Sequence, residues 1–269
     1  MDPFAARFGG IQRLVGLAGA ERLRHAHICI VGIGGVGSWT AEALARSGVG
    51  QLTLVDFDEV CISNTNRQLH AVSGAFGQPK VQVTTHRLQA IHPECTVHPN
   101  QAFLTSATAD AIFATRFDHV CDAIDRPAMK SLLIAECHRR QIPVITAGAA
   151  GGRLDPTAIR IADLAQATHD RLLVAVRKIL RADHGFPPAP KRFRIDCVYS
   201  PEPVVYPQTD GGVRTERPSS PDLRLDCASG YGTASFVTGA FGLAAAAYIV
   251  RRLTHAEAPG CKGQAMPCG

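Results

Sequence analysis

The fold of this chain is decided by residues 27–37, HICIVGIGGVG. The run begins as a short, continuous and β-branched apolar segment, which is typical of a strand buried on both faces of a sheet. Glycines follow in GxGxxG spacing at Gly32, Gly34 and Gly37, and residues 39–47 then form a helical segment. A strand, a glycine turn and a helix in this order predict the first βαβ unit of a nucleotide-binding fold.

Strands and helices alternate on both sides of this unit. Further short apolar runs predict strands over residues 51–57, 95–100, 118–123 and 143–147. Helical segments lie over residues 1–27, 80–91, 107–115 and 127–140. The pattern predicts the α/β class, with a Rossmann-like, mostly parallel sheet and helices on both faces.

This alternation ends after residue 152. The remainder predicts a C-terminal extension with a helix over residues 163–184, a Pro-rich loop over 185–191 and short strands at 204–206 and 223–225. We expect one domain over residues 1–253. Within it, residues 163–200 form a basic helix and Pro-rich loop insertion. Residues 254–269 show no periodicity and predict a flexible tail.

Composition indicates a soluble, globular protein. The 269 residues are 46% hydrophobic and 19% charged, which argues against disorder or a coiled coil. The nine cysteines are an odd number, and no two are spaced as CxxC. The N-terminal stretch does not read as a secretory signal, so we expect a cytoplasmic protein without disulfides or a four-cysteine zinc site.

Residues 228–250 carry no charge and are long enough to cross a bilayer. Four glycines and many Ala, Ser and Thr residues make the stretch poorly apolar, however. We therefore expect a buried helix, and membrane association through this stretch is the alternative.

The nucleotide-binding prediction extends beyond the glycines. Asp56 follows the second strand, where a carboxylate can accept hydrogen bonds from ribose hydroxyls. Arg67 and Lys80 together suit a triphosphate better than a dinucleotide, and Asp125 at the end of a strand suits Mg²⁺. We therefore expect ATP, with Arg67, Lys80 and Asp125 as the catalytic residues and Asp125 as the metal ligand. The candidate nucleotide-binding residues are Gly32, Gly34, Gly35, Gly37, Asp56, Asp58, Asn64, Arg67, Gln68, Lys80, Asp122 and Asp125.

Positive charge is concentrated in one segment. The whole chain has a formal charge of +5, and residues 171–194 alone carry seven basic residues against one acidic residue. Such a local concentration favours an anionic partner that docks at one place. The candidate contacts are Arg171, Arg177, Lys178, Arg181, Lys191, Arg192 and Arg194.

Several strings resemble a known family. GIGGVGS, VDFDEV and SNTNRQ, followed by Lys80 and Asp125, are similar to the ubiquitin-activating-enzyme-like adenylating enzymes. RFGGIQRLVG, NTNRQLHA, DCVYSPEPVVYPQ and DCASGYG resemble, within that superfamily, the bacterial tRNA threonylcarbamoyladenosine dehydratases. The resemblance covers residues 7–252.

The resemblance implies an activity and partners. It implies ATP-dependent adenylation of threonylcarbamoyladenosine beside the tRNA anticodon, followed by ring closure. Asn64, Arg67 and Lys80 would hold phosphates, Asp56 the ribose and Asp125 Mg²⁺. It also implies a homodimer, a monovalent cation (K⁺ or Na⁺) and a cysteine desulfurase or sulfur-acceptor system as a partner.

Some positions depart from the superfamily pattern or stay open. Gly10 stands where the superfamily has an arginine that reaches the partner subunit, and Arg7 or Arg13 is the candidate replacement. Cys227, and less so Cys197, is a candidate acyl acceptor. The alternatives are adenylation of the C-terminus of a ubiquitin-like sulfur carrier, a nicotinamide-dependent oxidoreductase, and a scaffold that binds ATP without turnover.

Overall fold

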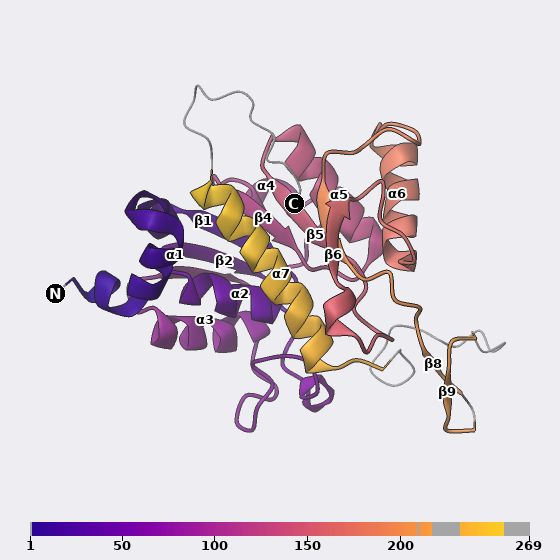
Figure 1. Ribbon diagram of the computed structural model, residues 1–269, viewed down its shortest axis with the longest axis horizontal. Helices are drawn as coiled ribbons and strands as arrows, with labels where there is room; N and C mark the ends of the chain where they lie inside the picture. Colours follow the sequence, from indigo (N-terminus) through magenta and orange to yellow (C-terminus); the bar gives the residue numbers. More distant parts are fainter. Residues whose placement is uncertain (1, 209, 217–231, 256–269) are drawn as a thin grey trace, which may run out of the picture.

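The computed structural model describes residues 2–208, 210–216 and 232–255. A seven-stranded sheet, in the order β3-β2-β1-β4-β5-β7-β6, forms its centre (Figure 1). Its strands are β1 His27–Val31, β2 Gln51–Val55, β3 Thr96–Asn100, β4 His119–Asp122, β5 Val144–Ala147, β6 Arg160–Asp163 and β7 Asp196–Tyr199. The short strands β8 Tyr206–Pro207 and β9 Val213–Arg214 form a separate pair.

Seven helices in the described part of the chain surround this sheet. They are α1 Pro3–His25, α2 Gly37–Arg46, α3 Lys80–Ile91, α4 Ala109–Ile112, α5 Pro127–Arg139, α6 Arg171–Asp183 and α7 Ser235–Thr254. Single 3₁₀ turns lie at Ile62–Asn64 and Pro156–Ala158.

Strand β1 is the point where the chain changes direction across the sheet. It pairs in parallel with β2 on one side and with β4 on the other, so Val31 at its end aligns with both Val55 and Asp122. Within the seven-stranded sheet, every neighbouring pair is parallel except β6 and β7, which are antiparallel. The carboxyl ends of β1, β2 and β4 therefore meet at one edge, which is where open α/β sheets bind ligands.

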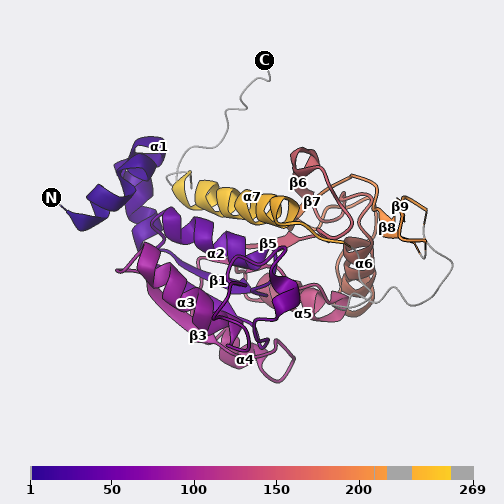
Figure 2. The same cartoon turned by 90° about the horizontal axis from the view of Figure 1, so that it is seen from below.

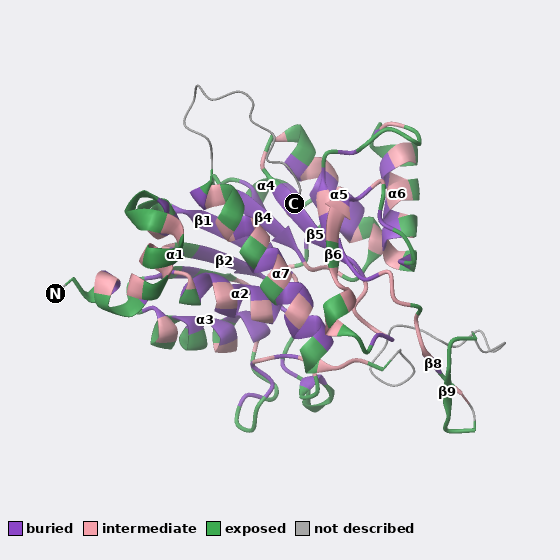
Figure 3. Ribbon diagram, in the orientation of Figure 1, coloured by how far each residue is buried: buried purple, intermediate pink, exposed green. Residues whose placement is uncertain are grey.

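Each face of the sheet has its own core. Alternate residues of β1 point to opposite faces: Ile28 and Ile30 join the core under α1, α2, α3 and α7, whereas Cys29 and Val31 join the core under α4, α5 and α6. Figure 2 shows the two helical layers, and Figure 3 shows the strands buried between them. The predicted fold class, a mostly parallel α/β sheet with helices on both faces, is confirmed.

The structure corrects the C-terminal third. Residues 163–170 do not belong to the predicted helix: Asp163 ends β6, and α6 begins only at Arg171. Asp170 caps that helix, since its carboxylate accepts from the Leu173 amide (3.0 Å). The segment 163–200 contributes β7 to the main sheet.

Smaller differences lie elsewhere. The helix predicted over 107–115 has only the one turn of α4, and the strand predicted at 204–206 is β8. The strand predicted at 223–225 and most of the tail, residues 256–269, lie outside the described residues.

Helix α7 forms from the predicted uncharged stretch but begins at Ser235. Its mean hydropathy of 1.3 and its length would let it cross a membrane, although 44% of that window is buried in the fold. Two of its glycines face α2: a Cβ on Gly242 would lie 2.7 Å from Trp39 Cβ, and one on Gly239 would lie 3.5 Å from the Trp39 ring. Small residues thus let α7 pack directly on α2.

These two glycines provide a matched test of that packing. We expect Gly242→Ala to lower the free energy of unfolding by about 1–3 kcal/mol, because its methyl group would overlap the α2 backbone. Gly239→Ala meets ordinary contact distances and should be neutral or stabilising by up to about 1 kcal/mol, since alanine favours helices. Urea denaturation measures both. Equal destabilisation of the two variants would contradict the close approach of α2 and α7.

Candidate nucleotide-binding and active site

The turn between β1 and α2 is tightly constrained by its own backbone. A Cβ on Gly37 would lie 1.9 Å from the Gly32 carbonyl oxygen. Gly32 itself has φ 91°, and a Cβ there would lie 2.8 Å from the Ala123 carbonyl in the loop after β4. Only glycine fits at these two positions. The start of α2 therefore lies at the carboxyl edge of the sheet, between β1 and β4.

The middle of the turn is open at Gly34, where the nearest atom to an added Cβ would be Gln68 Nε2 at 3.9 Å. Gly35 instead packs against α7, since a Cβ there would lie 3.1 Å from Thr238 Cγ2 and 3.5 Å from Arg67 Cγ. The turn therefore has free space at Gly34, with Gln68 and Arg67 beside it. Backbone amides at a helix start beside an arginine form a suitable cradle for phosphate groups.

Asp56 joins β2 to this turn. Its carboxylate accepts from the Ile33 amide (2.6 Å) and from the Asp58 amide (2.8 Å). Burial raises the pKa of Asp56, and the positive charge of Lys80 opposes this shift. Each carboxylate oxygen has two lone pairs, so Asp56 can still accept from a ribose hydroxyl.

Lys80 is buried at the start of α3. Its Nζ lies 2.8 Å from Asp58 Oδ2, and only 7% of the Lys80 side chain is exposed, whereas Asp58 is 59% exposed. Because Asp58 lies on the solvent side, Lys80 is held in place without being neutralised by a buried partner. Its charge remains available to an anion at the turn.

The segment after β2 holds Asn64, which ends the 3₁₀ turn Ile62–Asn64, and Arg67 three residues further on. Asn64 is buried and accepts from the Cys61 amide (3.0 Å). The Arg67 carbonyl accepts from Trp39 Nε1 (3.1 Å), and the Arg67 guanidinium donates to the Ser63 carbonyl (2.9 Å). These bonds place the Arg67 side chain beside the glycine turn.

The two predicted aspartates, Asp122 at the end of β4 and Asp125 in the loop after it, have different environments. Asp122 is fully buried and ion-paired with Lys130 (2.9 Å), so in this structure its carboxylate bonds within the fold and does not face the open edge. Burial raises the pKa of Asp122. Asp125 is exposed, and among the described residues none donates a hydrogen bond to its carboxylate. Asp125 is therefore a carboxylate at this edge that is available to a ligand.

The predicted basic contacts divide into two groups. Arg177 donates to the Leu164 and Ala167 carbonyls (3.1 and 2.9 Å), and Arg181 donates to the Pro187 carbonyl (3.2 Å), so both stabilise the fold. The guanidinium of Arg171 lies 5.8 Å over the Tyr206 ring. The exposed basic residues are Arg171, Lys178, Lys191, Arg192 and Arg194.

The exposed basic residues extend from one edge of the sheet to the other. The cap of α6, Asp170, accepts from the Ala149 amide just beyond β5, so Arg171 lies at the carboxyl edge. Residues 191–194 precede β7, which is parallel to β5, and therefore lie at the amino edge. The 13 residues of α6 separate these edges by about 20 Å.

The cysteine candidates are placed unequally. Cys197 lies in β7, fully buried, and burial raises the pKa of its thiol, which makes it unsuited to a nucleophile. Cys227 lies outside the described residues.

An aromatic pair beside the site is absent from the sequence prediction. The Phe57 and Phe103 rings stack at 4.4 Å and 23°, and the Arg126 guanidinium lies 6.0 Å over Phe103. Both rings remain substantially exposed, at 49% and 40%. Phe57 directly follows Asp56, and Arg126 directly follows Asp125. The position of Phe57 beside the candidate ribose ligand was the signal in the sequence that could have identified the pair.

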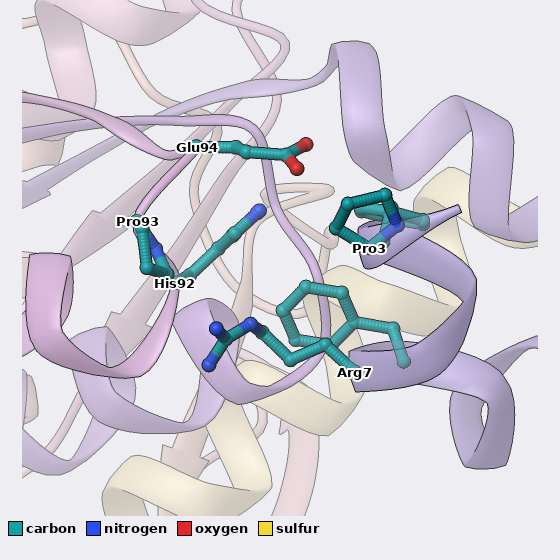
Figure 4. A pocket seen from close by; sticks show the side chains of 7 residues that line it. Pro3, Arg7, His92, Pro93 and Glu94 are labelled. Atoms are coloured by element: carbon teal, nitrogen blue, oxygen red, sulfur yellow. The ribbon is translucent and has the colours of Figure 1, made fainter. Parts of the chain in front are cut away.

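A cavity of about 140 Å³ lies at the opposite edge, between the start of α1 and the turn before β3 (Figure 4). His92 lines it, and its buried Nδ1 has no partner among the described residues. Arg7 also lines it and donates to the Ile91 carbonyl (3.1 Å). Arg7 thus lies away from the nucleotide-binding edge of its own chain.

A ThiF family model matches residues 10–267. The chain belongs to the ThiF family. The tRNA threonylcarbamoyladenosine dehydratase of Haemophilus influenzae is 46% identical over 254 residues, which are 94% of this chain and 95% of that protein. The resemblance that the sequence motifs indicated is thereby confirmed.

Two further relatives show how far the similarity extends. The crystal structure of E. coli tRNA N6-threonylcarbamoyladenosine dehydratase in complex with ATP matches with a TM-score of 0.85 and 39% identity, covering 95% of this chain and 97% of that one. The molybdopterin-synthase adenylyltransferase of Escherichia coli is 37% identical over 131 residues, 49% of this chain and 52% of that protein.

His70 is a buried residue that contacts Gln68 of the site and makes the stability of the fold pH-dependent. Its Nε2 lies 3.0 Å from Gln68 Oε1, and its Nδ1 lies 3.3 Å from Thr84 Oγ1. Burial, with the positive charge of Lys80, lowers the pKa of His70 to about 4. Between pH 6.5 and about 4, the unfolded chain binds a proton at this ring that the folded chain does not. The contribution of His70 to stability is therefore complete above pH 6.5 and declines as the pH falls towards 4.

We expect the native protein to lose up to about 3 kcal/mol more unfolding free energy over this window than His70→Gln, which cannot titrate there. Urea denaturation at pH 7, 6, 5 and 4 measures the difference. His25→Gln is the control, because the His25 side chain is 75% exposed. Parallel pH profiles for the native protein and His70→Gln would refute this role of His70.

Proposed function

We propose that this chain is an ATP-dependent tRNA threonylcarbamoyladenosine dehydratase. The observation that carries the proposal is the meeting of the glycine turn, Arg67, buried Lys80 and exposed Asp125 at one edge. This set suits phosphoryl chemistry rather than hydride transfer. Two relatives with this named activity each match 94% of the chain, whereas the molybdopterin-synthase adenylyltransferase of Escherichia coli matches 49% of it.

The chemistry is a dehydration coupled to ATP cleavage. The carboxylate of the threonyl group attacks the α-phosphorus of ATP, and pyrophosphate leaves. The carbamoyl group then attacks the acyl carbon of the adenylate, which closes a ring and releases AMP. The net loss from the nucleoside is one water, and no covalent link to the protein is needed; Cys227 remains the candidate for an alternative acyl step.

The residues of this chain act by positioning and by charge. The amides at the start of α2 and the guanidinium of Arg67 bind phosphate oxygens. Lys80 offsets the charge that develops on the departing pyrophosphate, and Asn64 and Gln68 orient the same segment. Asp56 accepts from the ribose, and Asp58 holds Lys80.

Mg²⁺ fits at Asp125. No group of three or more His, Cys, Asp or Glu side chains is arranged for a metal within residues 2–208, 210–216 and 232–255. A single exposed carboxylate suits Mg²⁺, which is commonly held by one carboxylate together with substrate phosphates. The ion would supply charge neutralisation of the triphosphate.

The pair Phe57 and Phe103 suits the adenine ring. Phe57 follows the ribose-binding position Asp56 in the chain, and Phe103 stacks on it. Stacking of a base on an aromatic surface is worth about 1–3 kcal/mol. Arg126 extends the surface by one guanidinium plane.

The first experiment is mass spectrometry of nucleosides from tRNA incubated with the protein, ATP and Mg²⁺. We expect threonylcarbamoyladenosine to lose the mass of one water. Lys80→Met should slow this at least about 100-fold, because it removes one charge that stabilises the transition state. Arg116→Ala, a change at an exposed site before β4, is the control. If tRNA stays unchanged while a sulfur-carrier C-terminus triggers ATP–pyrophosphate exchange, the protein-substrate alternative replaces this proposal.

The exposed basic residues along α6 suit the phosphates of a tRNA stem. Arg171 lies at the carboxyl edge with the nucleotide site, and Lys191, Arg192 and Arg194 lie about 20 Å away. When the modified base of a tRNA binds at the catalytic edge, the adjoining tRNA stem would lie beside Lys178 and the Pro-rich loop. Phe186 and Phe193 are buried, so this interaction depends on charge and shape.

We expect the triple change Lys178→Ala, Lys191→Ala and Arg192→Ala to weaken tRNA binding and leave ATP binding unchanged. The slope of log K against log salt should become less negative by about 1 for each phosphate that the variant no longer neutralises. Fluorescence titration at several salt concentrations measures it, with Arg116→Ala as the reference. An unchanged salt slope in the triple variant would place the tRNA elsewhere.

We propose that the protein is a homodimer and works in the cytoplasm, where its tRNA substrate is found. Phe236, Ala240, Leu243 and Ala247 follow one another at spacings of four, three and four along α7. Phe236 and Leu243 are about half exposed, which suits the helix seam of a second copy.

A further inference from the structure

The buried pair Lys130 and Asp122 is not explained by the nucleotide contacts. Both side chains are fully buried. Lys130 Nζ lies 2.9 Å from Asp122 Oδ2, 3.0 Å from Thr146 Oγ1 and 3.4 Å from the Asp122 carbonyl oxygen. The ammonium group has three protons, and these three acceptors use them all.

The carboxylate of Asp122 completes a closed network. Its Oδ2 also accepts from the Thr146 hydroxyl (2.7 Å), and its Oδ1 accepts from the Ile124 amide (3.1 Å). The network therefore joins the carboxyl end of β4, strand β5 and the first turns of α5. It also fixes the backbone that leaves β4 towards Asp125.

Asp125 depends on that backbone. Residues 123–126 lie between the network and Pro127, the first residue of α5. The Ala123 amide donates to the Val31 carbonyl (2.9 Å), which sets the loop against the glycine turn. Since no described side chain or amide donates to the Asp125 carboxylate, only the loop conformation directs it.

Stability alone does not account for such a pair. Removing two charges from water is costly, and buried ion pairs can often be replaced by apolar side chains without loss of stability. A role in orientation accounts for the closed geometry better, because partners of ligating groups commonly fix the orientation of the ligand.

We propose that Lys130 is a positioning residue which, through Asp122 and Thr146, holds the loop 123–126 so that Asp125 faces the metal-bound triphosphate. This inference rests on the function proposed above for Asp125. Lys130 and Asp122 touch neither ATP nor the metal ion.

The test compares ATP affinity with and without the metal. Calorimetry gives the dissociation constant of ATP in EDTA and in excess Mg²⁺. The constant in EDTA divided by the constant in Mg²⁺ measures how much Mg²⁺ strengthens ATP binding. The main variant combines Asp122→Val, Lys130→Met and Thr146→Val, which removes the network and leaves none of its three side chains unpaired. We expect the ratio to fall about 10–100-fold, towards that of Asp125→Asn, with the EDTA constant unchanged within about twofold.

The matched control is Thr53→Val, which removes a buried hydroxyl bonded to His27 Nε2 (2.8 Å) at another place in the sheet. It should leave the ratio unchanged. Hydrogen exchange provides a second measurement: the amides of residues 123–126 should exchange faster in the main variant than in Thr53→Val. If the main variant does not fold, Thr146→Val alone should lower the ratio by a smaller factor.

The outcomes separate the two proposals. A folded main variant with the native ratio, or one that loses affinity equally in EDTA, overturns the positioning role of Lys130. If Asp125→Asn keeps the native ratio, the metal role of Asp125 fails and the positioning role fails with it. If Asp125→Asn lowers the ratio and the network variant does not, only the role of Lys130 is overturned.

Discussion

The backbone contact between Gly37 and Gly32 is the constraint on which the rest of the structure depends. At this contact even a methyl group would collide with the Gly32 carbonyl oxygen, at 1.9 Å. It turns the chain from β1 into α2 within a few residues. The start of the helix therefore faces the carboxyl edge of the sheet, between β1 and β4. Asp56 bonds to the amide of Ile33 within the same turn, and Arg67 lies against Gly35. The close approach of Gly37 to Gly32 thus brings the glycine turn together with Asp56 and Arg67, which come from other segments of the chain.

The two edges of the sheet carry different chemistry. The carboxyl edge gathers the glycine turn, Lys80 and Asp125, which suit a triphosphate, and it is the edge where an open parallel sheet leaves a crevice. Helix α6 connects this edge to the amino edge and carries the exposed residues Arg171 and Lys178. A large anionic substrate can therefore place one base at the reaction centre and its backbone over a surface about 20 Å long.

Local patterns and tertiary contacts explain different residues of the site. The strands β1 and β2 could be predicted because they are short, apolar and followed by glycine or aspartate. The helix predicted over 163–184 began too early, because Asp163 and Asp170 lie beside apolar residues that also suit a helix. Tertiary bonds decide otherwise: Asp163 accepts from the Phe193 and Arg194 amides, and β6 pairs with β7. Strands joined by contacts distant in the chain leave little local signal.

The sequence by itself determined the fold class, the family and the residue types of the nucleotide site, because glycine spacing, strand apolarity and a following carboxylate are local properties of the chain. Only the tertiary structure decided what each charge does. Asp122 and Asp125 are three residues apart, yet one is buried against Lys130 and the other faces solvent. Arg177 and Lys178 are neighbours, yet one bonds to carbonyls in the fold and the other is exposed. The reason is physical: whether a charged side chain binds a ligand or a neighbour depends on the groups that packing places around it.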